Sequence, residues 1–364
     1  MKMLLLAFLL LPLTAYAQDD DFEPMDITPA IDLSPKPLNE DLGTLHAIPL
    51  EELKALAGKG ETMAQLELGL RYNNGKDVKK DLAEAAKWFE KSSAASPTGK
   101  FFLSMACLAG YGVKEDHEKG IALMTEAAKA GQVKAQLRLA MLYNTGLYVP
   151  KDPVQAVKWM KEAAERGDTD AQEQLGSYYA NGNGVDKNLE EARKWWLKAA
   201  IDGGDVIAQM SLAGLYDAGR GVKKDPAEAA RWARKAAEQG DSIAERLMGS
   251  RYFFGDGVEK DPAAAAEWFR RSALRGDQEA GRQLAVMYAA GEGVPRNYGS
   301  AYKWFSVAAL SGYTAAEEGR KEAAAHLGKR QLQDAALAAE QLSGRIKNSR
   351  RYPFTYPHPQ MVTE

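Results

Sequence analysis

Small, apolar and aromatic residues recur along this chain with a period of about 36 residues. A tyrosine marks the period at Tyr72, Tyr143, Tyr179, Tyr216, Tyr252 and Tyr288, with Cys107 in the one missing place. A tryptophan follows each time sixteen residues later, at Trp88, Trp159, Trp195, Trp232, Trp268 and Trp304, with Leu123 in the missing place. A fixed period of this length is typical of a repeat architecture. We therefore expect seven copies, which fill residues 61–312.

Each copy is predicted to form a helix, a turn and a second helix. In the fourth copy Ala171, Leu175 and Tyr179 stand four residues apart, so they lie on one stripe of a helix. A second stripe of this kind surrounds Trp195. Small residues such as Gly176 are expected to let two helix backbones approach closely.

The predicted second helices have clear start and stop signals. Good N-caps precede them at Asp81, Asp116, Asp152, Asn188, Asp225, Asp261 and Asn297. Six of the seven copies end in a glycine that suits a helix C-terminus, at Gly131, Gly167, Gly203, Gly240, Gly276 and Gly312. Five copies carry Gly-x-Gly in the turn, whereas the second glycine is replaced by Asp77 in copy one and by Tyr148 in copy three. If that place requires a positive φ, Tyr148 is strained.

The repeated pattern is A-x-x-x-L-G-x-x-Y-x-x-G-x-G-V-x-x-D-x-x-x-A-x-x-W-x-x-x-A-A-x-x-G, and it resembles the Sel1-like repeat, a relative of the tetratricopeptide repeat. The resemblance implies an all-α fold, an α/α solenoid in which about seven repeats form a right-handed superhelix between capping helices. It also implies an adaptor that binds other proteins, often in the bacterial envelope or in host contact. Copy two departs most from the pattern, with Ser104 and Cys107 in place of glycine and tyrosine, so its packing must differ.

The chain ends differ in composition from the repeats. Residues 1–17 combine Lys2, an apolar run and an Ala-x-Ala ending, as in a secretory signal peptide cleaved after Ala17. Residues 18–49 form an acidic, proline-rich leader that is expected to be extended or disordered. The alternative is a segment that docks on the folded body or on a partner. Residues 50–60 are predicted to form an N-terminal capping helix, and residues 313–343 C-terminal capping helices. Residues 344–364 read as a basic, proline-rich tail.

The composition argues against several functions. Lys and Arg number 47 against 50 Asp and Glu, so nothing favours nucleic acid as a partner. One cysteine excludes an intramolecular disulfide, and four scattered histidines form no metal-ligand cluster. The Gly-x-Gly turns join two helices instead of a strand and a helix, which argues against a dinucleotide site. We therefore expect no cofactor and no enzyme activity, and no transmembrane segment once the signal peptide is removed.

The first helices carry one asymmetric feature, at the places two and six residues after the leading small residue. These places hold Leu66 and Leu70, Phe101 and Met105, Leu137 and Met141 in the first three copies, and Arg246 and Arg282 in the last two. First helices usually line the concave face of such a solenoid, where ligands bind. We call these eight residues the inner strip and predict that they bind a partner protein. The alternative is that they pack between neighbouring repeats, as leucine and methionine at helical spacing usually do.

The sequence therefore indicates an exported scaffold that binds another protein, and the partner is not identified by it. A periplasmic adaptor or regulator is the first interpretation, and a secreted factor that contacts a host is the second. A cell-wall hydrolase or transferase on a repeat scaffold is the third. Localisation in the periplasm or in the culture medium would separate the first two.

Overall fold

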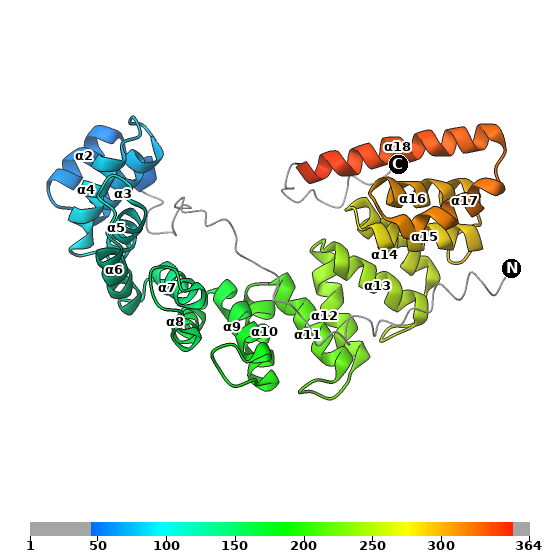
Figure 1. Ribbon diagram of the computed structural model, residues 1–364, viewed down its shortest axis with the longest axis horizontal. Coiled ribbons are helices and arrows are strands. Elements are labelled where there is room, and N and C mark those ends of the chain that lie inside the picture. Colours follow the sequence, from blue (N-terminus) through cyan, green and yellow to red (C-terminus); the bar gives the residue numbers. More distant parts are fainter. Residues whose placement is uncertain (1–44, 352–364) are drawn as a thin grey trace. The chain divides into compact units, whose positions relative to one another are not determined.

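The computed structural model describes residues 45–351, and of residues 349–351 it describes the backbone alone. This part of the chain contains 17 α-helices and two short 3-10 helices, and no strand (Figure 1). The chain divides between Lys91 and Ser92 into two compact units. Consecutive helices pack on one another in pairs within each unit, so the predicted all-α solenoid is confirmed.

The first unit holds the chain segment before the repeats and most of repeat 1. Its elements are η3 (Leu45–Ala47), α2 (Leu50–Gly58), α3 (Thr62–Asn74) and all but the last two residues of α4 (Leu82–Ser93). Leu53 and Ala57 of α2 are fully buried against Ala64 and Leu68 of α3. Helix α2 thereby covers the apolar face that the first repeat would otherwise expose to water.

The second unit holds the remaining six repeats, each with an odd-numbered first helix and an even-numbered second helix. The helices are α5 (Pro97–Ala109), α6 (His117–Lys129), α7 (Val133–Thr145), α8 (Pro153–Glu165), α9 (Thr169–Asn181), α10 (Leu189–Asp202), α11 (Val206–Ala218), α12 (Pro226–Glu238), α13 (Ser242–Phe254), α14 (Pro262–Leu274), α15 (Gln278–Ala290) and α16 (Tyr298–Leu310). From α6 to α15 each packs mainly on the helix before it and the helix after it. The core of the second unit is therefore continuous while every contact stays local.

The predicted helix starts are confirmed in all seven repeats. The Asp116 carboxylate accepts a hydrogen bond from the Lys119 backbone N–H at 2.9 Å, and the corresponding Asp or Asn does the same in every other repeat. These side chains satisfy N–H groups that the first helical turn leaves without a partner.

The turn between the two helices requires a left-handed backbone at its second glycine position. Gly112, Gly184, Gly221, Gly257 and Gly293 have φ between 67° and 73° there. Asp77 and Tyr148 adopt the same conformation, with φ of 60° and 63°, and they are the non-glycine residues with positive φ in the described chain. The expected strain at Tyr148 is confirmed, and a left-handed non-glycine residue costs about 1–2 kcal/mol.

The fourth repeat corrects one prediction about helix ends. Gly131, Gly167, Gly240, Gly276 and Gly312 adopt positive φ, but Gly203 has φ of −102°. Gly204 takes the left-handed conformation instead, with φ of 66°. Repeat 4 has one additional residue at this junction, so its second helix runs one residue further before the chain turns.

Close helix contacts explain the small residues and the departure of repeat 2. A Cβ atom on Gly176 would lie 2.5 Å from the Trp196 ring, so only glycine allows α9 to approach α10. In repeat 2 Ser104 replaces this glycine, and the close approach moves to Gly120 of the second helix. A Cβ atom there would lie 2.7 Å from Leu108. The predicted difference in packing is confirmed.

The last helix extends beyond residue 343, where the sequence predicts that the C-terminal capping helices end. The C-terminal end comprises η4 (Thr314–Ala316), α17 (Glu317–Ala325) and α18 (Lys329–Arg351), and α18 lies along α16 (Figure 1). Residues 344–351 belong to α18 and not to the tail, because Ser343 and Ile346 are buried and anchor that stretch. The rest of the predicted tail, residues 352–364, lies outside the described residues.

At the N-terminal end the predicted signal peptide and most of the leader, residues 1–44, also lie outside the described residues. The last leader residues, 45–49, lie on the folded body, which agrees with the second interpretation of the leader: Arg71 binds backbone carbonyls of this segment, as described below. Within residues 45–351, no helix combines the length and the apolar composition needed to cross a bilayer.

Candidate protein-interaction surfaces

The first members of the predicted inner strip are buried. Leu66 and Leu70 of α3 are 0% and 7% exposed, and Phe101 of α5 is 7% exposed. Each therefore contributes to packing, and a partner could contact these three side chains only after local rearrangement. Met105, Leu137 and Met141 are partly exposed and offer some apolar surface on α5 and α7.

The two arginines of the strip already have acidic partners within the chain. The Arg246 Nε donates to the Asp277 Oδ2 at 2.9 Å, and Arg282 donates to both carboxylate oxygens of Glu279 at 2.6 and 2.9 Å. Burial alone would raise the pKa of Glu279, but the hydrogen bonds from Arg282 and Tyr313 outweigh it and lower the pKa. An acidic partner would have to compete with these pairs, and the binding role of the strip stays a prediction.

The corresponding place in repeat 4 holds an acid. Burial raises the pKa of Glu173, and the nearby carboxylates of Asp205 and Asp170 raise it further. The Ser177 hydroxyl donates to the Glu173 Oε1 at 2.9 Å, which partly offsets the effect. Repeat 4, which lies between the apolar members and the arginine members of the inner strip, thus carries a carboxyl group at the equivalent place.

A row of buried glutamines joins successive repeats, and the sequence analysis missed it. Gln136 donates through Nε2 to the Ala128 carbonyl oxygen at 3.0 Å, and Gln172 does the same to Ala164 at 3.1 Å. Gln65 and Gln209 make the equivalent bonds in repeats 1 and 5. Each one satisfies a carbonyl at the end of the preceding helix. The signal was present, because a glutamine follows the leading alanine in these four repeats.

Repeat 6 has a glutamate, Glu245, where those glutamines stand. Burial raises its pKa, and the attraction of Arg275 only partly counteracts this. The Arg275 Nε donates to the Glu245 carboxylate at 3.2 Å. An acid in this buried place is held by an arginine that is itself half exposed.

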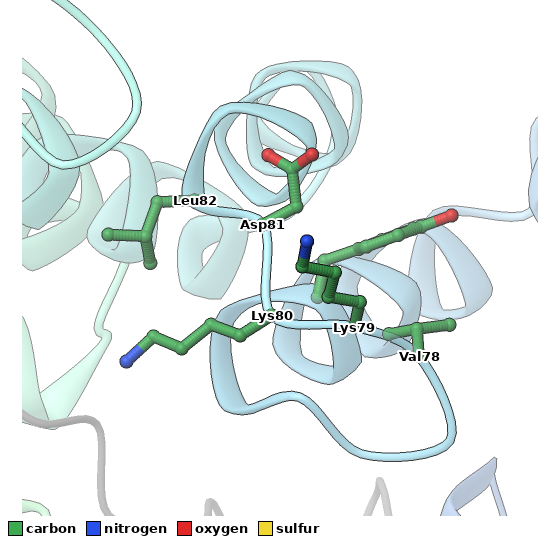
Figure 2. Close-up of a pocket in the computed structure, with 6 residues that line it drawn as sticks. Val78, Lys79, Lys80, Asp81 and Leu82 are labelled. Carbon is green, nitrogen blue, oxygen red and sulfur yellow. The ribbon is translucent and has the colours of Figure 1, made fainter.

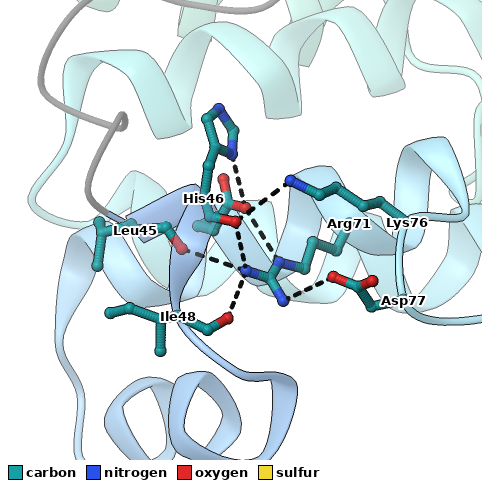
Figure 3. A network of polar contacts seen from close by, with 7 residues as sticks. Leu45, His46, Ile48, Arg71, Lys76 and Asp77 are labelled. Atoms are coloured by element: carbon teal, nitrogen blue, oxygen red, sulfur yellow. Dashed lines mark hydrogen bonds and ion pairs between the residues drawn. The ribbon is translucent and has the colours of Figure 1, made fainter.

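Repeat 1 contains a buried polar network around Arg71, shown in Figure 3. Its guanidinium donates to the Glu67 carboxylate and to the Asp77 carboxylate, both at 3.0 Å. Nη2 also donates to backbone carbonyl oxygens of the segment 45–48, the shortest bond being 2.8 Å to Ile48. The His46 Nδ1 lies 2.8 Å from the Glu67 Oε1, the same oxygen that accepts a hydrogen bond from the Arg71 Nε. The network fastens residues 45–48, here called the strap, to the first repeat.

Four of the six period-marking tryptophans are buried and structural. Trp159, Trp195, Trp232 and Trp304 are at most 8% exposed, and cations cover several of the rings, such as Lys198 Nζ at 4.2 Å from the Trp195 centroid. Cys107 is buried and forms no disulfide, as expected. These four tryptophans and Cys107 therefore hold the repeats together, whereas the period-marking tyrosines are partly exposed, as are Trp88 and Trp268.

A pocket of about 640 Å³ lies at the turn of repeat 1 (Figure 2). Tyr72, Val78, Lys79, Lys80, Asp81 and Leu82 line it. The Asp81 carboxylate caps α4 by accepting a hydrogen bond from the Glu84 backbone N–H. The other lining side chains are one tyrosine, two lysines, one valine and one leucine. Among the described residues, no group of His, Cys, Asp and Glu side chains is arranged to hold a metal ion.

Two solved structures resemble this chain along most of its length. One is the protein c5321, a protective antigen of uropathogenic Escherichia coli strains with an SLR fold, at 31% identity and a TM-score of 0.63. The match covers 85% of this chain and 67% of that one. The other is a Sel1 repeat protein from Oxalobacter formigenes, at 34% identity and a TM-score of 0.60 over 75% of this chain and 79% of that one.

A curated relative matches a shorter segment. The secretory immunoglobulin A-binding protein EsiB of Escherichia coli O6:H1 (strain CFT073) is 47% identical over 51 residues, which are 14% of this chain and only 10% of that protein.

The family model for the Sel1 repeat matches seven consecutive segments, and they agree with the seven copies predicted from the period. The matched residues are 62–96, 97–132, 133–168, 169–203, 206–241, 242–277 and 279–313. These segments span well over half of the chain. It therefore belongs to the Sel1 repeat family.

Proposed function

We propose that this protein is an exported scaffold without enzyme activity that binds another protein in the bacterial cell envelope. The observation that carries the proposal is the array of seven Sel1 repeats, because repeats of this kind typically bind proteins. An array in which each repeat contacts only its neighbours presents a long surface for its size. Export rests on the signal-peptide pattern of residues 1–17.

The localisation is tested first. Cells that express the full chain are separated into cytoplasm, periplasm, membranes and medium, and the mature N-terminus is identified by mass spectrometry. A periplasmic protein that begins at Gln18 supports the proposal. A cytoplasmic protein that retains residues 1–17 would refute export.

Binding is tested by crosslinking in the periplasm followed by affinity purification of the mature chain. The partly exposed side chains of the inner strip are the ones to change, because the buried members would disturb the fold. Leu137→Ser with Met141→Ser should weaken the capture of a specific partner. Val154→Ser is the matched control, since Val154 is 63% exposed and lies outside the strip. Equal capture by all variants would place the binding surface elsewhere.

A second candidate function is a secreted factor that contacts a host protein. It is supported by the similarity to a secretory immunoglobulin A-binding protein and to a protective antigen. The segment shared with the former is short, so its ligand is a hypothesis for this chain. Direct titration of secretory immunoglobulin A onto the mature chain tests it, with serum immunoglobulin G as the control. Protein found in the culture medium together with selective binding would favour this function over the first.

A further inference from the structure

The first helices of repeats 5 and 6 expose bulky apolar side chains that most other repeats lack. Ile207 of α11 and Ile243 of α13 directly precede the leading alanine and are 61% and 54% exposed. In four other repeats the same place holds polar residues: Thr98, Lys134, Asp170 and Glu279. The fold therefore does not require an isoleucine in either helix, and packing inside the array does not explain its presence.

Helix α13 continues this apolar surface to its C-terminal end. Leu247 and Phe254 follow Ile243 by four and eleven residues, so the three side chains lie on one face along about 17 Å. Phe254 is 52% exposed, and its ring stands edge-on to the buried Phe253 with centroids 5.1 Å apart. Repeat 5 has an alanine, Ala218, in the place of Phe254, so the exposed ring is a feature of repeat 6 and not of the repeat pattern.

Helices α11 and α13 begin side by side. Gln239, at the end of repeat 5, donates through Nε2 to the Gly204 carbonyl oxygen at 2.8 Å and to the Gln209 Oε1 at 2.9 Å. These bonds hold the residues before α13 against the chain on both sides of Ile207. Because Ile207 and Ile243 occupy the same turn of equivalent helices, they lie on the same side of the second unit.

The part of α11 that follows Ile207 is open. Gly214 lies seven residues further on the same face, and a Cβ atom added to it would meet no atom within 4 Å. Ala218, one turn beyond, is exposed as well. Packed helices stand about 8–10 Å apart, and small residues permit the shorter distance, so a further helix can approach α11 closely here. We call the four bulky residues the apolar face: Ile207, Ile243, Leu247 and Phe254.

The junction of repeats 4 and 5, which borders this face, carries acids without a cation. In repeat 6 Arg246 pairs at 2.9 Å with Asp277, the N-cap of the next first helix. The corresponding two places of repeats 4 and 5 hold Glu173 and Asp205. Burial and the charge of Asp205 both raise the pKa of Glu173. Within the described part of the chain neither acid forms an ion pair with a lysine or arginine, and Asp205 lies only two residues before Ile207.

We propose that the apolar face binds a basic amphipathic helix of the partner protein. The apolar side of that helix packs on the face, as amphipathic helices do on apolar surfaces of their receptors. One of its arginines or lysines pairs with Glu173 and Asp205, and so supplies the charge that Arg246 supplies in repeat 6. An acidic helix is disfavoured, because like charges across an interface repel. The inference rests on the proposed function and names the kind of segment that the scaffold binds.

The first test titrates two labelled model helices onto the mature chain by fluorescence anisotropy. They share one leucine face, and their polar faces carry either lysine or glutamate. We expect the leucine–lysine helix to bind roughly tenfold more tightly than the leucine–glutamate helix. Ile243→Thr with Phe254→Ala should weaken its binding roughly tenfold, because less apolar surface is buried. Other repeats hold threonine and alanine in these places, so the fold is kept.

The matched control for this pair removes two exposed apolar side chains elsewhere. Val154→Ser with Leu337→Ser should leave the binding of the leucine–lysine helix unchanged, since these residues are 63% and 56% exposed on α8 and α18. Circular dichroism verifies that both double variants are folded. An equal loss in the two double variants would show that the model helix binds any exposed apolar side chain, and it would overturn the proposal.

The second test isolates the charge. Glu173→Gln keeps an oxygen that accepts the hydrogen bond from the Ser177 hydroxyl, so the local structure is retained. It should weaken the leucine–lysine helix roughly threefold and make its binding less dependent on salt. Glu118→Gln is the control, because Glu118 is an exposed acid of repeat 2, outside this surface.

The outcomes separate this inference from the proposed function. The inference is overturned if the leucine–lysine helix does not bind, if the leucine–glutamate helix binds equally well, or if Glu173→Gln has no more effect than Glu118→Gln. Each of these results would count against it even when the mature chain captures a specific partner in the periplasm. Binding that follows the expected pattern, together with no captured partner, would instead refute the proposed function alone.

Discussion

Two arginines stand in the same place of two different repeats, one at the end of the array and one inside it. Arg71 of repeat 1 and Arg251 of repeat 6 each follow the leading alanine by seven residues and directly precede the period-marking tyrosine. Each is 2% exposed. Other repeats have apolar residues such as Leu142, Leu215 and Met287 in this place. The partners of the two guanidinium groups show how a repeat array ends.

Arg251 is bound both to the repeat before it and to the turn of its own repeat. It pairs with Asp217 of α11 and donates to the Pro226 carbonyl oxygen at the start of α12, and it also donates to the carbonyl and carboxylate of Asp256. Arg71 has no preceding repeat, and it donates instead to carbonyls of the strap, at Leu45, His46 and Ile48. The strap therefore supplies acceptors that a preceding repeat supplies elsewhere, and together with the single helix α2 it closes the end of the array.

The acids in the two networks differ in burial. The Glu67 side chain that pairs with Arg71 is 1% exposed, whereas Asp217 and Asp256 beside Arg251 are 35% and 52% exposed. An ionised group that loses its partner in a buried place is costly, but an exposed one is solvated by water. The same substitution should therefore have unequal effects at the two sites.

The largest effect is expected for Arg71→Met, which leaves Glu67 buried with only His46 as partner. We expect a loss of about 3–5 kcal/mol in the stability of the first unit, as for other broken buried ion pairs. Urea unfolding with hydrogen exchange in α2 measures it. Arg71→Met combined with Glu67→Leu should recover part of the loss, because Leu247 holds that place in repeat 6. Equal losses in the single and double variants would show that the strap contacts, and not the buried acid, set the cost.

A similar loss is expected for an interior tryptophan. Trp232 is 5% exposed in repeat 5, so Trp232→Ala should cost about 3–5 kcal/mol and should also loosen the neighbouring repeats. Trp88 of repeat 1 is partly exposed, and Trp88→Ala should cost less. Thermal unfolding of the two variants followed by circular dichroism compares them. An equal or larger loss at Trp88 would contradict the view that the end repeat is less tightly packed.

Arg251→Met should be milder than Arg71→Met. The acids left behind can be solvated, and methionine fits a place that holds Met287 in repeat 7, so we expect a loss of about 1–2 kcal/mol. Urea unfolding under the conditions used for Arg71→Met measures the difference. A loss as large as that of Arg71→Met would mean that removal of the buried guanidinium, and not the burial of the acid left behind, sets the loss of stability in both networks.

The smallest effect is a gain of about 1 kcal/mol for Glu245→Gln at pH 7, since glutamine can bond the carbonyl that it bonds in four other repeats. Burial raises the pKa of Glu245, so the native chain loses stability as pH rises from the unfolded value of about 4.3 through the folded pKa. The gain should therefore vanish at pH values below about 4, where the glutamate is protonated in both states.

The mirror substitution Gln209→Glu in repeat 5 is the control for Glu245→Gln. It places an acid in the same buried position of another repeat and should destabilise the chain at pH 7. Urea midpoints at pH 7 and pH 4 measure both variants. A gain for Glu245→Gln that persists unchanged at pH 4 would exclude the buried charge as its cause.

Much of the fold could be predicted because the repeat multiplies each local signal. Asp116 and its six equivalents cap the second helices where expected, and the positive φ of Tyr148 follows from the glycines that occupy its place in other repeats. The exception at Gly203 comes from a single additional residue, which the period of 36 does not describe. Prediction of the candidate site was weaker, because the spacing of Leu66 and Phe101 does not reveal whether a neighbouring repeat covers them.

The sequence alone thus determined the family, the number of repeats and the boundaries of most helices. Each repeat is built from contacts between residues fewer than 40 positions apart, so its pattern can be recognised along the chain. Only the tertiary structure decided which side chains are covered and which charges are already paired. Arg246 and Arg282 look like free cations in the sequence, but Asp277 and Glu279 neutralise them. Such pairs depend on how the side chains of packed helices meet, and hydrophobic periodicity carries no information on that geometry.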